Sequence, residues 1–281
     1  MRNSSFEIRP ATGNCGALLD GIDLSADHPD STYADIRKAL CEYGVIFFRK
    51  QNLSNDQYVS FGEKFGDLVA SKFIPTLPEN PKIAVIRKEA DQERNVGGAW
   101  HTDNPYREIP PMGTILLARE LPEYGGDTCF INMRAAYDSL SDGLKKTLET
   151  LRGVHSNAQV YGKLAKPEKQ ANPSMINLDQ AAQEVTHPIV IRHPEAGHNA
   201  LFVSPSYTVR FDGWSDEESQ SLLPFLFRHV QRPEFQCRFH WEEGSMAFWD
   251  DRQTLHYAVN DYFGSRRLMY RLMVAGTGPL G

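Results

Sequence analysis

From about residue 80 onward, the chain consists of short apolar runs separated by turn-forming residues. Runs of this length are typical of strands, since a helix needs a longer stretch with a period near 3.6. Many short strands with few helices among them favour an antiparallel sandwich or barrel with helices packed outside. The runs are Ile83–Ile86, Thr114–Ala118, Thr128–Ile131, Val185–Ile191, Ala200–Val203, Ser245–Trp249 and Leu268–Val274.

Helix signals are clear in the N-terminal part of the chain. Apolar residues recur at helical spacing within 31–43, and Gly44 follows as a stop signal. Val45–Phe48 is apolar throughout, which predicts a buried strand. Ser54 and Gln57 have the spacing of a capping box, which predicts that a second helix begins there. Further helices are predicted at Met133–Leu140, Ser141–Leu151 and Ser215–His229.

The composition is that of an ordinary globular chain. Its 281 residues allow one large domain or two small ones. The 30 Lys and Arg against 36 Asp and Glu give a net charge of −6, which argues against a general nucleic-acid-binding surface. The 4 cysteines form no Cys-x-x-Cys pair, and there is no signal-peptide pattern or membrane span. We expect a soluble, cytoplasmic protein.

The segment 164–184 differs from its surroundings. It is polar, contains Pro167 and Pro173, and shows no periodicity. Long irregular segments inside a compact domain are often functional lids. We therefore expect a lid insertion here, with an ordinary surface loop as the alternative.

The sequence Trp100-His101-Thr102-Asp103 is the first candidate for chemistry. Residues two apart on an extended chain share a face, so His101 and Asp103 would converge on one point. An imidazole and a carboxylate placed in this way supply two metal ligands. Taken alone, the pair is better explained as a surface or hydrogen-bonded pair. His256 follows the apolar run that ends at Trp249, and a lone histidine in such a place is more often a buried structural residue than a ligand.

Two arginines follow in a predicted strand. Arg267 and Arg271 are four residues apart and share one face of an otherwise apolar segment. Burying such charges is costly unless they contact anions. The alternative is an exposed edge strand with solvated charges, which the apolar neighbours oppose.

Together these residues suggest one site. Two histidines and one carboxylate form the facial triad that leaves open coordination positions in oxygen-activating Fe(II) enzymes. A turn predicted at 260–265 would bring the chain back from His256, so that Arg267 lies near the metal. This arrangement predicts an organic diacid bound between iron and an arginine.

With these motifs in this order and spacing, the chain resembles the taurine dioxygenase and 2,4-dichlorophenoxyacetate dioxygenase family of Fe(II)/2-oxoglutarate-dependent enzymes. The resemblance runs from about Phe6 to Val274. It implies a distorted double-stranded β-helix, or jelly roll, as a single domain over 1–281. The anchoring motifs are Trp100-His101-Thr102-Asp103, Gly125-Gly126-Asp127-Thr128, Phe248-Trp249-Asp250, His256-Tyr257-Ala258 and Arg266-Arg267 through Arg271.

The resemblance also implies residue roles and cofactors. His101, Asp103 and His256 match the iron ligands of the family. Thr128 and Arg267 match the residues that bind the far carboxylate of 2-oxoglutarate. Arg271 matches an arginine near the co-substrate's other carboxylate and, in several relatives, near the substrate anion. The enzyme would use Fe(II), O2 and 2-oxoglutarate, release succinate and CO2, and hydroxylate an aliphatic C–H bond. Homo-oligomers are common in the family, so a homo-oligomer is expected.

A charge count suggests the substrate class. Iron, Asp103, 2-oxoglutarate and Arg267 sum to zero, so Arg271 is left with one positive charge. A buried unpaired charge is costly, which favours a substrate carboxylate, sulfonate or sulfate. Alternatively, Arg271 serves the co-substrate or pairs with a local carboxylate.

The substrate-reading segments differ from those of the taurine enzyme. The stretch Gly97-Gly98-Ala99 has no polar side chain to meet an amine, and the loop after Gly66 has no histidine for a sulfonate. A larger or aromatic anion, as in the aryloxyalkanoate enzymes, fits better, although plain core packing explains each pocket candidate equally well. These tentative candidates are Val69, Phe73, Asn104, Tyr106, Tyr161, Tyr207 and Arg271.

Three other functions compete with this interpretation. The protein could act on a biosynthetic intermediate by hydroxylation, desaturation or another oxidative rearrangement. A zinc hydrolase would use the same ligands, but it typically needs a His-Glu-x-x-His helix, which the sequence lacks. A non-catalytic metal-binding relative is opposed by the intact triad together with Arg267.

Overall fold

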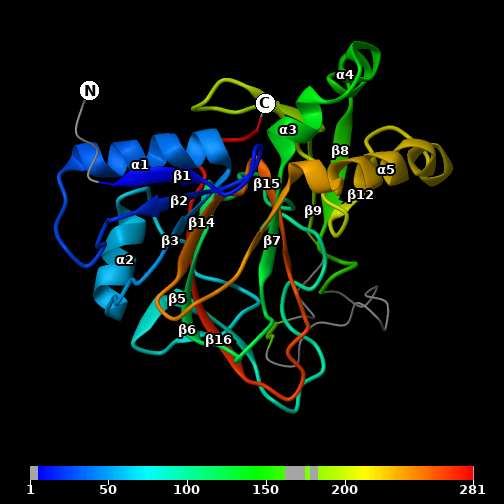
Figure 1. Ribbon diagram of the computed structural model, residues 1–281. Coiled ribbons are helices and arrows are strands. Elements are labelled where there is room, and N and C mark those ends of the chain that lie inside the picture. The colour runs from blue at the N-terminus through cyan, green and yellow to red at the C-terminus, as the bar shows by residue number, and fades with distance from the viewer. Residues whose placement is uncertain (1–5, 162–174, 178–182, 281) are drawn as a thin grey trace.

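The computed structural model describes residues 6–161, 175–177 and 183–280, and its largest element is an eight-stranded sheet (Figure 1). Most neighbouring strands in this sheet are antiparallel, and β2 and β3 are parallel. In spatial order the strands are β1 (Glu7–Pro10), β2 (Ala17–Asp20), β3 (Val45–Phe48), β14 (Met246–Asp250), β6 (Gly113–Glu120), β16 (Arg267–Val274), β5 (Asn80–Lys88) and β4 (Thr76–Leu77).

A second sheet covers one face of the first. It contains β13 (Gln236–Phe239), β7 (Thr128–Asn132) and β15 (Thr254–Ala258). Apolar side chains from both sheets form one buried cluster between them. This double-sheet architecture is the predicted jelly roll. Two small antiparallel sheets extend it: β12 (Thr208–Phe211), β8 (Arg152–Ser156) and β9 (Glu184–Pro188) form one, and β10 (Val190–Arg192) and β11 (Asn199–Leu201) form the other.

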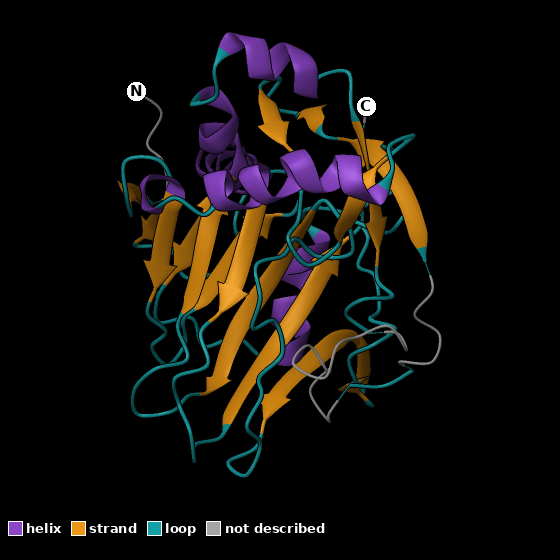
Figure 2. Ribbon diagram, turned by 90° about the vertical axis from the view of Figure 1, so that its right-hand side faces the viewer, coloured by secondary structure: helices purple, strands orange, loops and turns teal. Residues whose placement is uncertain are grey.

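Helices pack outside the sheets, as Figure 2 shows. The helices α1 (Asp30–Tyr43) and α2 (Asn55–Glu63) share a buried cluster with the outer face of the large sheet. The predicted capping box at Ser54 and Gln57 is confirmed, and Gly44 ends α1 with a φ of 75°. Near the smaller sheets lie α3 (Met133–Asp138), α4 (Asp142–Leu148), α5 (Asp216–Val230) and a 3-10 turn at Pro233–Phe235.

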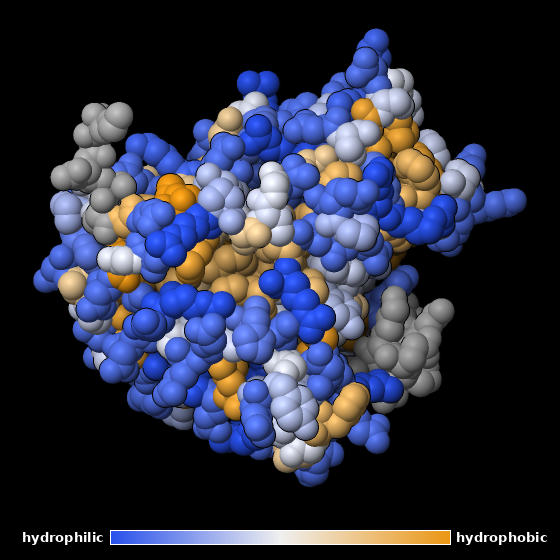
Figure 3. Space-filling view, viewed as in Figure 1, coloured by the Kyte–Doolittle hydropathy of each residue, from blue (hydrophilic) through white to orange (hydrophobic). Residues whose placement is uncertain are grey.

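Strand β3 explains how the large sheet can be buried on both faces. Because side chains alternate along a strand, Val45 and Phe47 face the second sheet, while Ile46 and Phe48 face the helices. Phe47 stacks on Phe239 of the opposing sheet, with ring centroids 4.1 Å apart. The exterior is mostly hydrophilic on the face that Figure 3 shows, with small apolar areas between the polar ones.

The prediction of one strand over the apolar run Val185–Ile191 is wrong. The chain breaks at Ile189, where it passes from β9 to β10 in another sheet. Pro188 has no backbone N–H to continue a ladder, and Ile189 instead bonds to Leu151 and accepts from Phe202. Seven strands were not predicted, because their sequences show no clear apolar run or alternation: β1, β2, β4, β8, β12, β13 and β15.

The predicted lid at 164–184 lies largely outside the described residues, which include only 175–177 and 183–184 of it. Among the helices that the structure describes, none is both long and apolar enough to cross a membrane.

Tyr58 provides a test of how α2 is attached to the sheet. Its side chain is fully buried, and its hydroxyl lies 2.8 Å from the carbonyl oxygen of Ile115 and 3.0 Å from that of Tyr270, on adjacent strands. We expect Tyr58→Phe to lower the free energy of unfolding by about 1–3 kcal/mol, because it leaves buried carbonyls without their donor. Thermal unfolding measures this change. Tyr124→Phe is the control, because Tyr124 is 72% exposed. Equal melting temperatures for the two variants would contradict the expectation.

Candidate functional site

A two-residue bridge between distant segments forms the centre of the site. The amide of His101 donates to the carbonyl of His256 at 3.0 Å, and the amide of His256 donates back at 2.7 Å. The two imidazole rings lie 4.0 Å apart between centroids. Asp103 follows in the next turn, and one ligand atom from each of the three residues lies within 4.8 Å of the other two. Sequence reasoning named these three residues, and the structure brings them together.

The ring orientation of His101 is set by its backbone. Its Nδ1 atom lies 2.7 Å from the carbonyl oxygen of Ala99, which can only accept, so Nδ1 carries the hydrogen. The Nε2 lone pair is then free for a metal. Burial lowers the pKa of His101, and burial together with His101 lowers that of His256 well below its usual value. Both imidazoles are therefore neutral, as metal ligation requires.

Asp103 is surrounded by groups that favour its charged form. Arg271 Nη1 donates to its Oδ1 at 3.2 Å, and Thr114 Oγ1 lies 3.0 Å from its Oδ2. Burial raises the pKa of this carboxyl, but Arg271 and the two histidines outweigh it, so the net pKa is lowered. The contact realises one alternative from the sequence, in which Arg271 pairs with a local carboxylate.

A second carboxyl lies behind Asp103. Asp251 is 1% exposed, and burial and the neighbouring charge of Asp103 raise its pKa well above the usual value. The sequence analysis did not single it out, although it directly follows the motif Phe248-Trp249-Asp250. The sequence signal available was a second acidic residue at the end of an apolar strand.

A small pocket adjoins the histidines on the inner face of the large sheet. Arg267 is 5% exposed there, and its Nε and Nη2 atoms have no partner among the described residues. Gly126, with a φ of 70°, permits its close approach, since a Cβ there would lie 3.2 Å from Arg267 Cδ. The pocket is lined by Ile86, Val96, Gly97, His101, Leu116, Thr128, Trp249, His256, Ala258, Arg267 and Arg271.

Thr128 is oriented within this pocket by a residue that the sequence did not reveal. The indole N–H of Trp241 donates to Thr128 Oγ1 at 3.0 Å. The hydroxyl hydrogen of Thr128 is thereby left to donate to another acceptor. The Arg267 guanidinium lies 5.8 Å from the centre of the same indole ring. Thr128 and Arg267 together offer hydrogen-bond donors suited to a carboxylate.

A larger cavity of about 330 Å³ opens onto the ligands from the other side. Its polar groups include Arg271 and the hydroxyls of Tyr161 and Tyr207, which lie 2.8 Å from each other. Arg271 lines both cavities. The remaining lining residues are Ile74, Arg94, Asn95, Val96, Gly97, Gly98, Ala99, His101, Asp103, Val160, Met175, Ser206, Tyr257 and Asn260.

The tentative substrate residues occupy different positions. Tyr161 and Tyr207 line the large cavity. Phe73 stacks on Tyr161 at 4.8 Å, and Tyr106 packs against Tyr207, so both support this wall. Asn104 accepts from the Tyr106 hydroxyl and is not a lining residue of that cavity.

Val69 is not brought to this cavity either. It is a neighbour of β16, where its amide donates to the carbonyl of Met273 at 2.9 Å. The polar side chains of Asn95, Ser206 and Asn260, which line the cavity, were missed. They lie in loops that carry no periodic signal.

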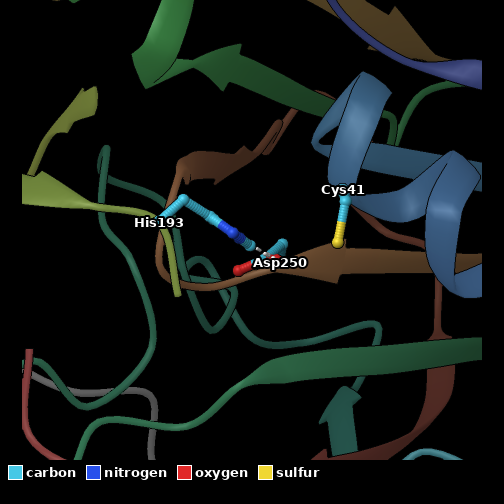
Figure 4. Close-up of side chains that lie close together, drawn as sticks. All are labelled: Cys41, His193 and Asp250. Carbon is cyan, nitrogen blue, oxygen red and sulfur yellow. Dashed lines mark hydrogen bonds and ion pairs between the residues drawn. The ribbon is translucent and has the colours of Figure 1, made fainter. Parts of the chain in front are cut away.

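A second cluster, Cys41, His193 and Asp250, also has three ligand-type side chains close together (Figure 4). Its atoms are already engaged. Asp250 contacts Arg252 at 2.6 Å and His193 at 2.8 Å, and His193 Nδ1 accepts from the amide of Ala196. Burial raises the pKa of the Cys41 thiol to about 12, which keeps it neutral. This cluster is a hydrogen-bonded ion pair rather than a metal centre.

The fold and these two cavities define a class of enzyme. The chain belongs to the family described as taurine catabolism dioxygenase TauD, TfdA family, whose profile matches residues 7–273. It is a 2-oxoglutarate-dependent dioxygenase, and its cofactors are Fe(II), 2-oxoglutarate and O2.

Two relatives and one solved structure show the closeness of the match. The chain is 36% identical to an alkylsulfatase from Acinetobacter baylyi, over 98% of this chain and 87% of that protein. It is 34% identical to an alpha-ketoglutarate-dependent sulfate ester dioxygenase from Pseudomonas putida, over 98% and 91%. The crystal structure of a taurine dioxygenase from Burkholderia xenovorans superposes with a TM-score of 0.83 and 35% identity, over 99% and 91%.

Arg267 gives a test of the small pocket. We expect Arg267→Met to leave the melting temperature of the cofactor-free protein unchanged or higher, because it removes a buried charge without a partner. The same change should weaken 2-oxoglutarate binding roughly 10–100-fold, through the loss of charge-assisted hydrogen bonds. Thermal shift and calorimetric titration with 2-oxoglutarate measure both effects.

The neighbouring Arg266→Met is the matched control. Arg266 is partly exposed and pairs with Glu89 and Glu120 at the surface. It should alter neither quantity appreciably. Unchanged 2-oxoglutarate affinity in Arg267→Met would show that the co-substrate binds elsewhere.

Proposed function

We propose that His101, Asp103 and His256 hold the Fe(II) ion of this enzyme, and that Thr128 and Arg267 bind 2-oxoglutarate. Two features support this assignment: the convergent His/Asp/His donor set and the buried guanidinium of Arg267, whose Nε and Nη2 lack partners among the described residues. An anion fits that guanidinium, since a buried charge needs a partner. Zinc would accept the same three ligands, but it gives Arg267 no role.

The chain's own residues have a positioning task. Bound Fe(II), 2-oxoglutarate and O2 supply the oxidation that replaces an aliphatic hydrogen by a hydroxyl group, with succinate and CO2 as by-products. The Ala99 carbonyl holds His101 in the required orientation, and Arg271 keeps Asp103 ionised. The aromatic side chains packed around Tyr207 form one wall of the substrate cavity.

For the substrate we propose an alkyl sulfate ester. The observation that carries this is the large cavity, where Arg271 and the hydrogen-bonded Tyr161–Tyr207 pair, which has one O–H left to donate, can bind an anionic head. Apolar side chains line other parts of the same cavity and suit a hydrocarbon chain; they include Ile74, Val96, Val160 and Met175. The names of the alkylsulfatase and sulfate ester dioxygenase relatives support the same class.

The chemistry of such a substrate follows from where it is hydroxylated. Hydroxylation of the carbon that bears the ester oxygen gives a hemiacetal-type sulfate. That carbon–oxygen bond then breaks, which yields an aldehyde and inorganic sulfate. An aryloxyalkanoate hydroxylated at the equivalent carbon would instead release a phenol.

Three broader features complete the proposal. The 281 residues form one domain, because the ligand residues come from the middle and the C-terminal part of the chain and bind one ion. Of the segment 164–184, which the sequence predicts to be a lid, the described residue Met175 lines the cavity. A cytoplasmic location, the absence of nucleic-acid and membrane partners, and a homo-oligomeric state stay predictions.

The proposed function predicts a specific pair of products. Incubation with Fe(II), 2-oxoglutarate, O2 and hexyl sulfate should yield succinate and inorganic sulfate in equal amounts. Taurine should give less succinate, because the described lining residues include no acidic side chain other than the proposed ligand Asp103 to meet its amine. Ion chromatography of sulfate and succinate measures both reactions.

Two variants serve as controls. Asp103→Ala should abolish product formation, because it removes a metal ligand, while His28→Ala alters a histidine outside both side-chain clusters and should retain it. Succinate formed with phenoxypropionate, without sulfate release from hexyl sulfate, would favour the aryloxyalkanoate alternative. No succinate with any sulfate, sulfonate or carboxylate would contradict the proposal.

A further inference from the structure

Two consecutive aspartates at the end of strand β14 point in different directions. Asp250 points to His193, as Figure 4 shows, and also pairs with Arg252. Asp251 points to the opposite side and contacts the segment that carries Asp103. Because side chains alternate along a strand, Asp250 contacts the ion-pair cluster and Asp251 contacts the candidate metal site.

Asp251 is held by several donors from different elements. Its Oδ1 lies 3.0 Å from the Trp249 indole nitrogen and 3.3 Å from the amide nitrogen of Asp103. Its Oδ2 lies 2.7 Å from Thr114 Oγ1 on β6. The hydroxyl of Thr102 donates to its backbone carbonyl at 2.6 Å. These contacts fix Asp251 to the residues immediately before and at the proposed ligand Asp103.

Thr114 connects the two carboxyl groups. Its Oγ1 lies 3.0 Å from Asp103 Oδ2 and 2.7 Å from Asp251 Oδ2. The other oxygen of Asp103 accepts from Arg271. Thr114 and Arg271 thus each hydrogen-bond one oxygen of the Asp103 carboxylate, and Asp251 hydrogen-bonds Thr114.

Packing alone does not account for Asp251. The residue is 1% exposed, lines neither the small pocket nor the large cavity, and has no ion pair with any described residue. An apolar side chain of similar size would avoid the cost of burying a carboxyl group. Its hydrogen bonds instead connect it to Thr102, the Asp103 amide and Thr114, as well as to Trp249.

We propose that Asp251 is a positioning residue that orients Asp103 toward Fe(II) through Thr114 and the Asp103 amide. This inference rests on the proposed function, in which Asp103 is a metal ligand. Groups that hydrogen-bond a metal ligand set its orientation, and their loss typically weakens metal binding about 10–100-fold.

The test is an anaerobic Fe(II) titration of the full chain at saturating 2-oxoglutarate, followed by the weak visible charge-transfer band. We expect Asp251→Ala to weaken Fe(II) affinity roughly 10–100-fold and to alter the band. Asp251→Asn should stay close to wild type. Its amide can donate to Thr114 and its carbonyl can accept from the Asp103 amide and Trp249, so the hydrogen bonds are kept.

Asp250→Asn is the matched control from the same strand end. It weakens the contacts with Arg252 and His193, so it should lower the melting temperature while Fe(II) affinity stays unchanged. Thr114→Val preserves the side-chain shape and removes the connecting hydroxyl. It should weaken Fe(II) binding, and it decides the matter if Asp251→Ala does not fold.

The outcomes separate two failures. A wild-type protein that shows no band contradicts the proposed function itself. A normal wild-type band with wild-type Fe(II) affinity in Asp251→Ala and Thr114→Val overturns the positioning role alone. The role is also overturned if Asp251→Asn binds Fe(II) as weakly as Asp251→Ala, or if Asp250→Asn weakens binding equally.

Discussion

The reciprocal backbone hydrogen bonds between His101 and His256 are the contact on which the site depends. They join a loop that follows β5 to strand β15 of the second sheet, so the two imidazoles meet only when both parts of the jelly roll are in place. A metal bound here would therefore stabilise the closed arrangement of these parts, because ligands of the native state shift the unfolding equilibrium. The same bridge brings Asp103 into hydrogen-bond contact with Asp251, which directly follows β14, and with Thr114 on β6.

Charge then determines what each cavity can accept. Arg271 contacts Asp103 and lines both cavities, whereas Arg267 lines the small pocket and has guanidinium nitrogens without partners. The charge count made from the sequence left Arg271 unpaired, but the structure pairs it with the ligand carboxylate. Burial lowers the pKa of Arg267, which reflects the cost of keeping that cation without an anion. In the proposed assignment, the co-substrate's carboxylate would offset this cost, and the substrate anion would share Arg271 with Asp103.

The sequence predicted the parts of this protein that have local signals. Ser54 and Gln57 mark a helix start by their spacing alone, and Val45–Phe48 is apolar because both of its faces are covered. The triad was found because His101 and Asp103 are two residues apart and His256 follows an apolar run, and the family resemblance then matched all three to iron ligands. Asp251, Thr114 and Trp241 were not found, because their roles arise from contacts across strands that sequence spacing does not reveal. The loop residues that line the large cavity were missed for the same reason.

The contrast between Asp250 and Asp251 shows why acidic residues in one motif require separate interpretation. Asp250 lies against Arg252, which lowers its pKa, while burial and the charge of Asp103 raise that of Asp251. In the Cys41 cluster, ligand-type side chains are satisfied by protein partners. In the His101 cluster, the ligand-type groups are oriented by the protein while the Nδ1 atom of His256 stays buried without a partner among the described residues. Proximity of His, Cys and Asp is thus insufficient to define a metal centre; what distinguishes one is donor capacity that the protein itself leaves unused.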